Sequence, residues 1–86
     1  MNRQESPNFD DRPANVPVDM LVLHYTGMKS AADALERLCD PAAKVSAHYF
    51  INTNGAVTAL VDEDKRAWHA GVSYWRGHTD INARSI

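Results

Sequence analysis

The apolar run Met20-Leu21-Val22-Leu23 constrains the fold of this 86-residue chain more than any other segment. With its neighbours it predicts a β-strand over residues 18–25. Because every position of the run is apolar, both faces of the strand are expected to be buried, as in the central strand of an α/β sheet. Such a strand needs a covering layer on each side, and one short helix cannot supply both. The sequence therefore predicts a fragment, or a chain that needs a partner.

The remaining pattern predicts one helix and a hairpin. Ser30 and Asp33 form a capping-box-like start, apolar residues recur at helical spacing after it, and Asp40-Pro41 ends the helix. Residues 47–52 and 56–61 are predicted to pair as a hairpin because Asn-Gly is a favoured tight turn. This gives about three strands and one helix.

The chain divides into two parts. Residues 1–17 are predicted to be an extended leader, since three prolines block a helix and central-strand pairing there. Residues 18–86 are predicted to be the N-terminal part of a domain that is truncated at its C-terminal side. The charged residues 62–66 are expected to form a solvated turn, and residues 72–82 a loop.

Composition excludes several classes of function. The chain is 44% hydrophobic and 23% charged, with a formal net charge of -2, which gives no electrostatic basis for binding nucleic acid or an anionic membrane. No window is long enough to span a bilayer, and the N-terminus lacks the pattern of a signal peptide. A single cysteine, Cys39, excludes an intramolecular disulfide. We expect a cytoplasmic protein in which Cys39 is a small buried hydrophobe.

Four histidines raise the question of a metal site. His24 follows the apolar run directly and is the best candidate ligand, with a hydrogen-bonded core histidine as the equally weighted alternative. His48 and His69 are expected to be structural, packed groups, and His78 an exposed loop residue. No compact ligand motif such as His-x-x-x-His is present, and no general base stands out.

Two further residues are candidates for substrate binding. Arg66 has the geometry to clamp a carboxylate, although an arginine in a charged turn is usually solvated. Trp68, with Tyr74 and Trp75, offers a surface for stacking on a sugar ring, although aromatic residues near a glycine-rich loop more often pack the loop down.

These motifs, taken in order, resemble the zinc-dependent N-acetylmuramoyl-L-alanine amidases, the type 2 amidases that are related to the peptidoglycan recognition proteins. The matching stretches are Leu21-Val22-Leu23-His24-Tyr25-Thr26, Val45-Ser46-Ala47-His48-Tyr49-Phe50-Ile51, Asn54-Gly55 and Asp64-Lys65-Arg66-Ala67-Trp68-His69-Ala70-Gly71. The final Asn82-Ala83-Arg84-Ser85-Ile86 resembles the start of the family's Ser-Ile-Gly-Ile-Glu segment. The likeness covers residues 18–86.

The resemblance implies an α/β fold with a mixed central β-sheet and flanking helices, incomplete in this chain. It implies hydrolysis of the amide between muramic acid and the L-alanine of the peptidoglycan stem peptide, with peptidoglycan or a muropeptide as substrate. Zinc would polarise the carbonyl group and activate a water molecule. By position, His24 matches the first zinc ligand, and Arg66 and Trp68 fall in a stretch that lines or supports the substrate groove.

The resemblance also implies that no catalytic residue lies in this chain. The family's catalytic glutamate is expected just beyond Ile86, and its other zinc ligands are expected later still. Two alternatives therefore stay open beside the amidase hypothesis: a non-catalytic peptidoglycan-binding module, and a truncated remnant without a function of its own.

Overall fold

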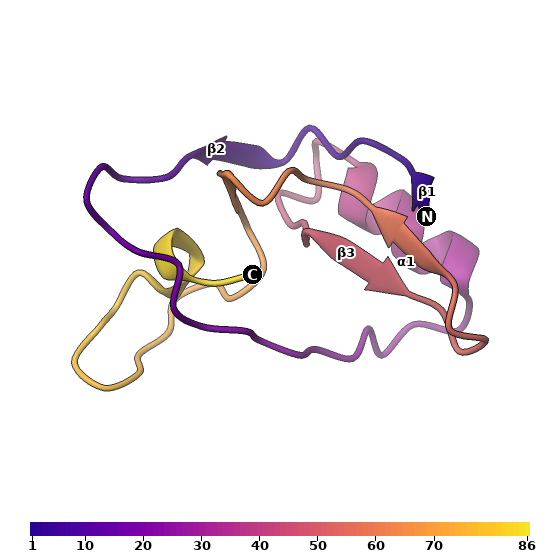
Figure 1. The fold of residues 1–86 in the computed structure, drawn as a ribbon. Helices are drawn as coiled ribbons and strands as arrows, with labels where there is room; N and C mark the ends of the chain where they lie inside the picture. The colour runs from indigo at the N-terminus through magenta and orange to yellow at the C-terminus, as the bar shows by residue number, and fades with distance from the viewer.

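A mixed three-stranded sheet and a two-stranded sheet form the body of the protein (Figure 1). The structure is a computed structural model that describes all of residues 1–86. Its elements are β1 (Asn2–Arg3), β2 (Phe9–Asp11), α1 (Ala31–Cys39), β3 (Tyr49–Ile51), β4 (Val57–Ala59), β5 (Lys65–Ala67) and the 3-10 helix η1 (Ile81–Arg84). In the larger sheet, in the order β1-β4-β3, β1 runs parallel to β4 and β3 antiparallel to it. The predicted α/β class with a mixed sheet is confirmed.

Local sequence signals placed α1 and the β3–β4 hairpin correctly. The Ser30 side chain accepts a hydrogen bond from the backbone N–H of Asp33 at 3.1 Å, and Asp40 caps the other end of α1. In the hairpin, Tyr49 pairs with Ala59, and the turn contains Gly55 at a φ of 86°, where glycine is favoured.

The apolar core lies between α1 and the sheets. Leu60, Val61 and Ala67 are buried at its centre. Four partly buried side chains pack against them: Leu35, Leu38, Cys39 and Phe50. Cys39 is thus a partly buried apolar group, and burial raises the pKa of its thiol, which disfavours the reactive thiolate.

The N-terminal segment, which the sequence predicts to be an extended leader, contains β1 and β2 and packs against the rest of the chain. β1 pairs with β4, and β2 pairs with β5 in antiparallel register. Asn8 is buried, and its side-chain amide donates to the backbone carbonyl oxygens of Asp40 and Val45, both at 2.9 Å. The prolines fall outside β1 and β2, so they leave these short strands free to pair.

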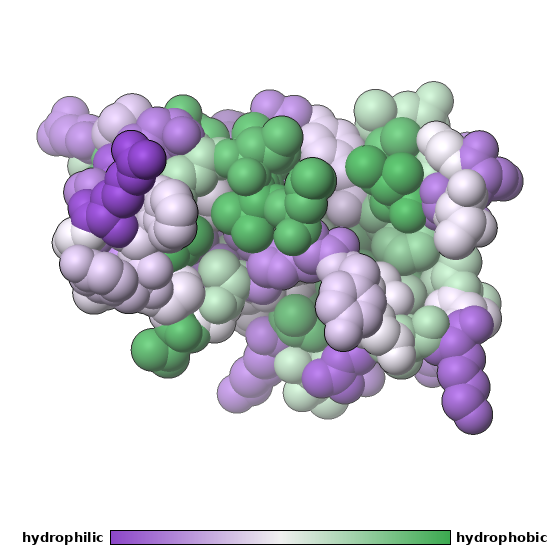
Figure 2. Space-filling model, turned by 90° about the horizontal axis from the view of Figure 1, so that it is seen from below, coloured by the Kyte–Doolittle hydropathy of each residue, from purple (hydrophilic) through white to green (hydrophobic).

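The buried strand predicted over residues 18–25 is wrong. The segment is extended but makes only one isolated parallel bridge, Met20 to Ser85, and Leu23 keeps 83% of its surface exposed. Figure 2 views the side of the molecule on which this segment lies and shows hydrophobic side chains gathered there. The reason is that α1 and Phe50 pack on the core residues Leu60, Val61 and Ala67, and an open cavity separates residues 21–26 from α1 and β3.

The charged turn is shorter than the predicted range of residues 62–66. Residues 62–64 form the turn, but Lys65 and Arg66 already belong to β5. Their long side chains pair with acidic residues of the N-terminal segment, namely Asp11 and Asp10. Composition alone does not distinguish such paired charges from solvated ones.

The helices are short. α1 is nine residues long, and no helix in the structure has the length and apolar character needed to cross a bilayer.

Candidate functional site

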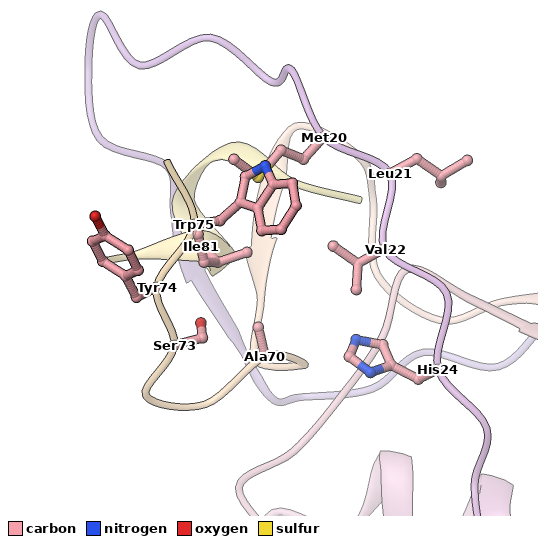
Figure 3. A pocket seen from close by; sticks show the side chains of 9 residues that line it. All are labelled: Met20, Leu21, Val22, His24, Ala70, Ser73, Tyr74, Trp75 and Ile81. Atoms are coloured by element: carbon pink, nitrogen blue, oxygen red, sulfur yellow. The ribbon is translucent and has the colours of Figure 1, made fainter. Parts of the chain in front are cut away.

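His24 lies at the edge of an open, mostly apolar cavity of about 420 Å³ (Figure 3). Val22 and His24 project toward Ala70 and Ile81 on the opposite side, whereas Leu21 points away. The complete lining is Met20, Leu21, Val22, His24, Ala70, Ser73, Tyr74, Trp75 and Ile81. The cavity therefore lies between the extended segment and the loop that leads into η1.

The His24 ring contacts a second imidazole. Its Nε2 lies 3.0 Å from Nδ1 of His69, and the two rings meet edge to face with centroids 5.2 Å apart. The His24 residue is exposed, while His69 is partly buried. The fold thus brings His24, the best candidate ligand predicted from the sequence, into contact with His69. His69 is packed and hydrogen-bonded, as the sequence predicts.

Backbone and side-chain contacts hold His69 on its other sides. Its Nε2 lies 2.9 Å from Oγ of Ser85, which is fully buried. Its backbone N–H donates to Oδ1 of Asn82 at 3.1 Å. Burial first, and then the neighbouring His24, lowers the pKa of His69 from 6.5 to about 4, so the ring is neutral at neutral pH.

Asn82 links η1 to the segment that carries His69. Its Oδ1 accepts from the backbone N–H groups of both His69 and Ala70, and the residue is 6% exposed. We expect Asn82→Ala to lower the free energy of unfolding by about 2 kcal/mol, because two partly buried N–H donors lose their acceptor. Urea denaturation measures this change. Asn2→Ala, at an exposed strand position, is the matched control, and equal losses for the two variants would contradict the role of Asn82.

His48 is a buried structural residue, as predicted. Its Nε2 lies 2.9 Å from the backbone carbonyl oxygen of Lys65, which can only accept, so this nitrogen carries the proton. Arg12 Nη2 lies 3.1 Å from the same nitrogen and is therefore a nearby charge rather than a donor to it. Nδ1 is buried without a partner. Burial, opposed by the bond to Lys65, lowers the pKa of His48.

This lowered pKa predicts acid sensitivity. In the unfolded chain the imidazole titrates near pH 6.5, and in the folded chain it titrates lower. Below about pH 6.5 the unfolded state binds more protons, so the free energy of unfolding falls there by at most about 1.4 kcal/mol per pH unit from this group. We expect His48→Gln to show a shallower fall than the wild type between about pH 7.5 and about pH 5 in urea titrations. Parallel curves would contradict the assignment.

Arg66 and Trp68 do not line the cavity beside His24. The Arg66 guanidinium pairs with Asp10 and Asp80, at 3.2 and 2.8 Å. Burial lowers the pKa of Arg66, but pairing with the two carboxylates outweighs this effect, so the pKa lies above its ordinary value. Trp68 is half-buried, and its backbone N–H donates to Oγ of Ser46 at 2.9 Å. These contacts give both residues a structural role, and their binding of substrate stays a prediction.

His78 is exposed, as predicted, and lies in a tight turn with Trp75.

The chain does not hold a complete zinc centre. A catalytic zinc site uses three protein ligands and one open position. No three His, Cys, Asp or Glu side chains of residues 1–86 are placed to hold one metal ion. His24 and His69 contact each other through the His24 Nε2 and the His69 Nδ1, and Ser85 lies against the other His69 nitrogen. Of these two rings, only that of His24 keeps a nitrogen, Nδ1, without a hydrogen-bond partner.

Sequence reasoning missed Ser85 and Asn82 as supports of this site. Each lies in the short segment 81–86, which has no periodic pattern and contacts residues that are at least twelve positions away. The only available signal was the likeness of residues 82–86 to a family motif, which gave no contacts.

Comparison with known proteins identifies the family. The family model described as N-acetylmuramoyl-L-alanine amidase matches residues 14–86. This chain belongs to that family. The 1,6-anhydro-N-acetylmuramyl-L-alanine amidases AmpD of Haemophilus influenzae and Escherichia coli are 34% and 36% identical to it, over 95% and 98% of this chain. The N-acetylmuramoyl-L-alanine amidase AmiD of Escherichia coli is 38% identical over 80% of it.

The fold comparison agrees with the family assignment. A crystal structure of a selenomethionine derivative of AmpD matches 99% of this chain with a TM-score of 0.83 at 34% identity. The chain spans about half the length of the AmpD relatives, 54% and 55% of the two named above, and 57% of the crystallised chain. It covers 26% of AmiD.

Proposed function

We propose that this chain, in its full natural length, is an N-acetylmuramoyl-L-alanine amidase. It would hydrolyse the amide between the lactyl group of muramic acid and the L-alanine of the stem peptide. The observation that carries the proposal is His24, which lies within the residues matched by the family model and is exposed beside a cavity. We assign it as the first zinc ligand from the resemblance of its sequence motif to the family. His24 would supply one zinc ligand. Residues 1–86 bring no three His, Cys, Asp or Glu side chains together around one metal ion, so we propose that the other zinc ligands and the catalytic glutamate lie beyond Ile86 in the full natural-length protein.

The cavity suits part of a muropeptide. Its lining is mostly apolar and includes Trp75 and Tyr74, whose rings offer flat apolar surface to a sugar or to the methyl groups of a lactyl-alanine linkage. The similar AmpD proteins are named as amidases of 1,6-anhydro-N-acetylmuramyl-L-alanine. We therefore propose the 1,6-anhydro muropeptide as substrate and cytoplasmic muropeptide recycling as the setting.

The test is an assay of the full natural-length protein with added zinc on three substrates: a 1,6-anhydro muropeptide, its reducing counterpart and intact peptidoglycan. Mass spectrometry should detect free stem peptide, released fastest from the anhydro form. Removal of metal by a chelator should stop the release, and zinc should restore it. Absence of free peptide from all three substrates would overturn the proposal.

The same material tests the binding alternative. If the protein sediments with insoluble peptidoglycan at low salt but releases no peptide, the family fold serves here as a non-catalytic binder. If it releases peptide, the binder hypothesis fails.

A further inference from the structure

The position of a single proton on Ser85 determines the hydrogen-bonding state of the His24–His69 pair. Ser85 Oγ lies 2.7 Å from the backbone carbonyl oxygen of Ile81 and 2.9 Å from Nε2 of His69. A hydroxyl group has one proton, and a carbonyl oxygen can only accept. The Ser85 proton therefore points to Ile81, and its oxygen accepts from His69.

This fixes the tautomer of His69. Since Nε2 donates to Ser85, it carries the ring proton, and Nδ1 of the neutral ring holds a lone pair. That lone pair faces Nε2 of His24 at 3.0 Å. Two ring nitrogens at this distance form a hydrogen bond only if one of them carries the proton, so His24 Nε2 is the donor.

We propose that Ser85 and His69 are positioning residues for His24, which they hold in the Nε2–H tautomer with Nδ1 as its free lone pair. The Nδ1 atom makes no hydrogen bond within the protein, and the ring borders the cavity. A metal ligand of this kind usually donates its other ring N–H to a fixed acceptor, which orients the ring and increases its basicity. The value of this arrangement for a metal rests on the proposed function, whereas the tautomer follows from the contacts alone.

The three residues come from three segments, so the arrangement depends on the fold. His24 lies in the extended segment before α1, His69 follows β5, and Ser85 follows η1. Met20 and Ser85 form a parallel bridge, and Val22 donates to the carbonyl oxygen of Ile86 at 2.9 Å. These backbone bonds set the distance between the first and third segments.

The test is NMR of the ¹⁵N-labelled protein without metal or substrate, at a pH where the imidazoles are neutral. Long-range proton–nitrogen correlation spectra report the tautomer of each ring. We expect Nε2–H on both His24 and His69, and a scalar coupling across the hydrogen bond between His24 Nε2 and His69 Nδ1. A proton on Nδ1 of either ring would overturn the proposal.

Variants separate positioning from mere packing. In His69→Asn, the side-chain oxygen can replace Nδ1 as acceptor, so His24 should stay in the Nε2–H form. In His69→Leu, of similar bulk but without an acceptor, the His24 signals should move to the tautomer average. Ser85→Ala should shift His69 itself toward that average. His78, exposed in its turn, should be unchanged throughout.

Two further results would contradict the proposal. One is a His24 tautomer that is the same in His69→Leu as in the wild type, in a variant whose amide spectrum shows it to be folded. The other is a His24 response equal in His69→Asn and His69→Leu. Because the measurement uses no substrate, a failed amidase assay with the expected tautomers would overturn the proposed function and leave this inference standing.

Discussion

Replacing Arg12 by methionine is expected to lower the free energy of unfolding by about 3 kcal/mol, the largest stability loss we expect from one substitution. Its guanidinium donates to four backbone carbonyl oxygens, at distances of 2.9 to 3.2 Å. These acceptors belong to Glu63, Asn82, Ala83 and Ser85. Methionine keeps much of the aliphatic stem and removes every donor, so the carbonyl groups that Arg12 shields from water lose their partner.

The Arg12 contacts also explain why the Arg12→Met substitution should weaken the structure of the candidate site. Three of the four carbonyl groups lie in residues 82–85, the segment that supports His69 through Asn82 and Ser85. Burial lowers the pKa of Arg12, yet an arginine stays charged at any pH at which the protein is studied. The side chain therefore places a permanent positive charge against the carbonyl groups at the end of η1, where it is favourable.

Urea denaturation of wild type, Arg12→Met, Arg12→Lys and Arg37→Met measures the effect. Lysine retains the charge but cannot span acceptors with a planar fork, so Arg12→Lys should lie between wild type and Arg12→Met. Arg37 is exposed on α1, and its replacement should leave stability nearly unchanged. If Arg12→Met and Arg37→Met unfold at the same urea concentration, Arg12 does not hold the segment as described.

Elements specified by neighbouring residues could be predicted from the sequence. The Ser30 cap and the Asp40-Pro41 stop bound α1, and the Asn54-Gly55 turn fixes the β3–β4 register. Each of these signals acts within a few positions, so no knowledge of the rest of the fold was needed.

Contacts between distant segments could not be predicted in this way. Arg12 lies in a proline-rich stretch without periodicity, and its acceptors are backbone atoms, which carry no residue-specific signal. The pairing of His24 with His69 joins positions 45 residues apart. The run at residues 20–23 predicts burial from hydrophobicity, but burial depends on a covering layer, which residues 1–86 do not provide for Leu21 and Leu23.

Among residues 1–86, the His24 ring is the group whose loss should have the largest effect on activity. In the full natural-length protein, we expect His24→Ala to lower the rate of stem-peptide release by well over about 100-fold, because replacing even the residues that orient metal ligands costs 10- to 100-fold. His69→Leu should lower the rate by only about 10- to 100-fold, because it removes the acceptor of His24 Nε2–H but leaves the His24 Nδ1 lone pair in place.

Comparison of three variants makes the His24 prediction specific. His78→Ala removes an exposed loop imidazole and should keep wild-type activity. His69→Asn restores an acceptor and should recover part of the activity that His69→Leu loses. Tightly bound zinc, measured by metal analysis after gel filtration, should fall with His24→Ala and stay at the wild-type level with His78→Ala. A His24→Ala protein that releases stem peptide as fast as His78→Ala would show that this histidine, despite its place beside the cavity, takes no part in the reaction.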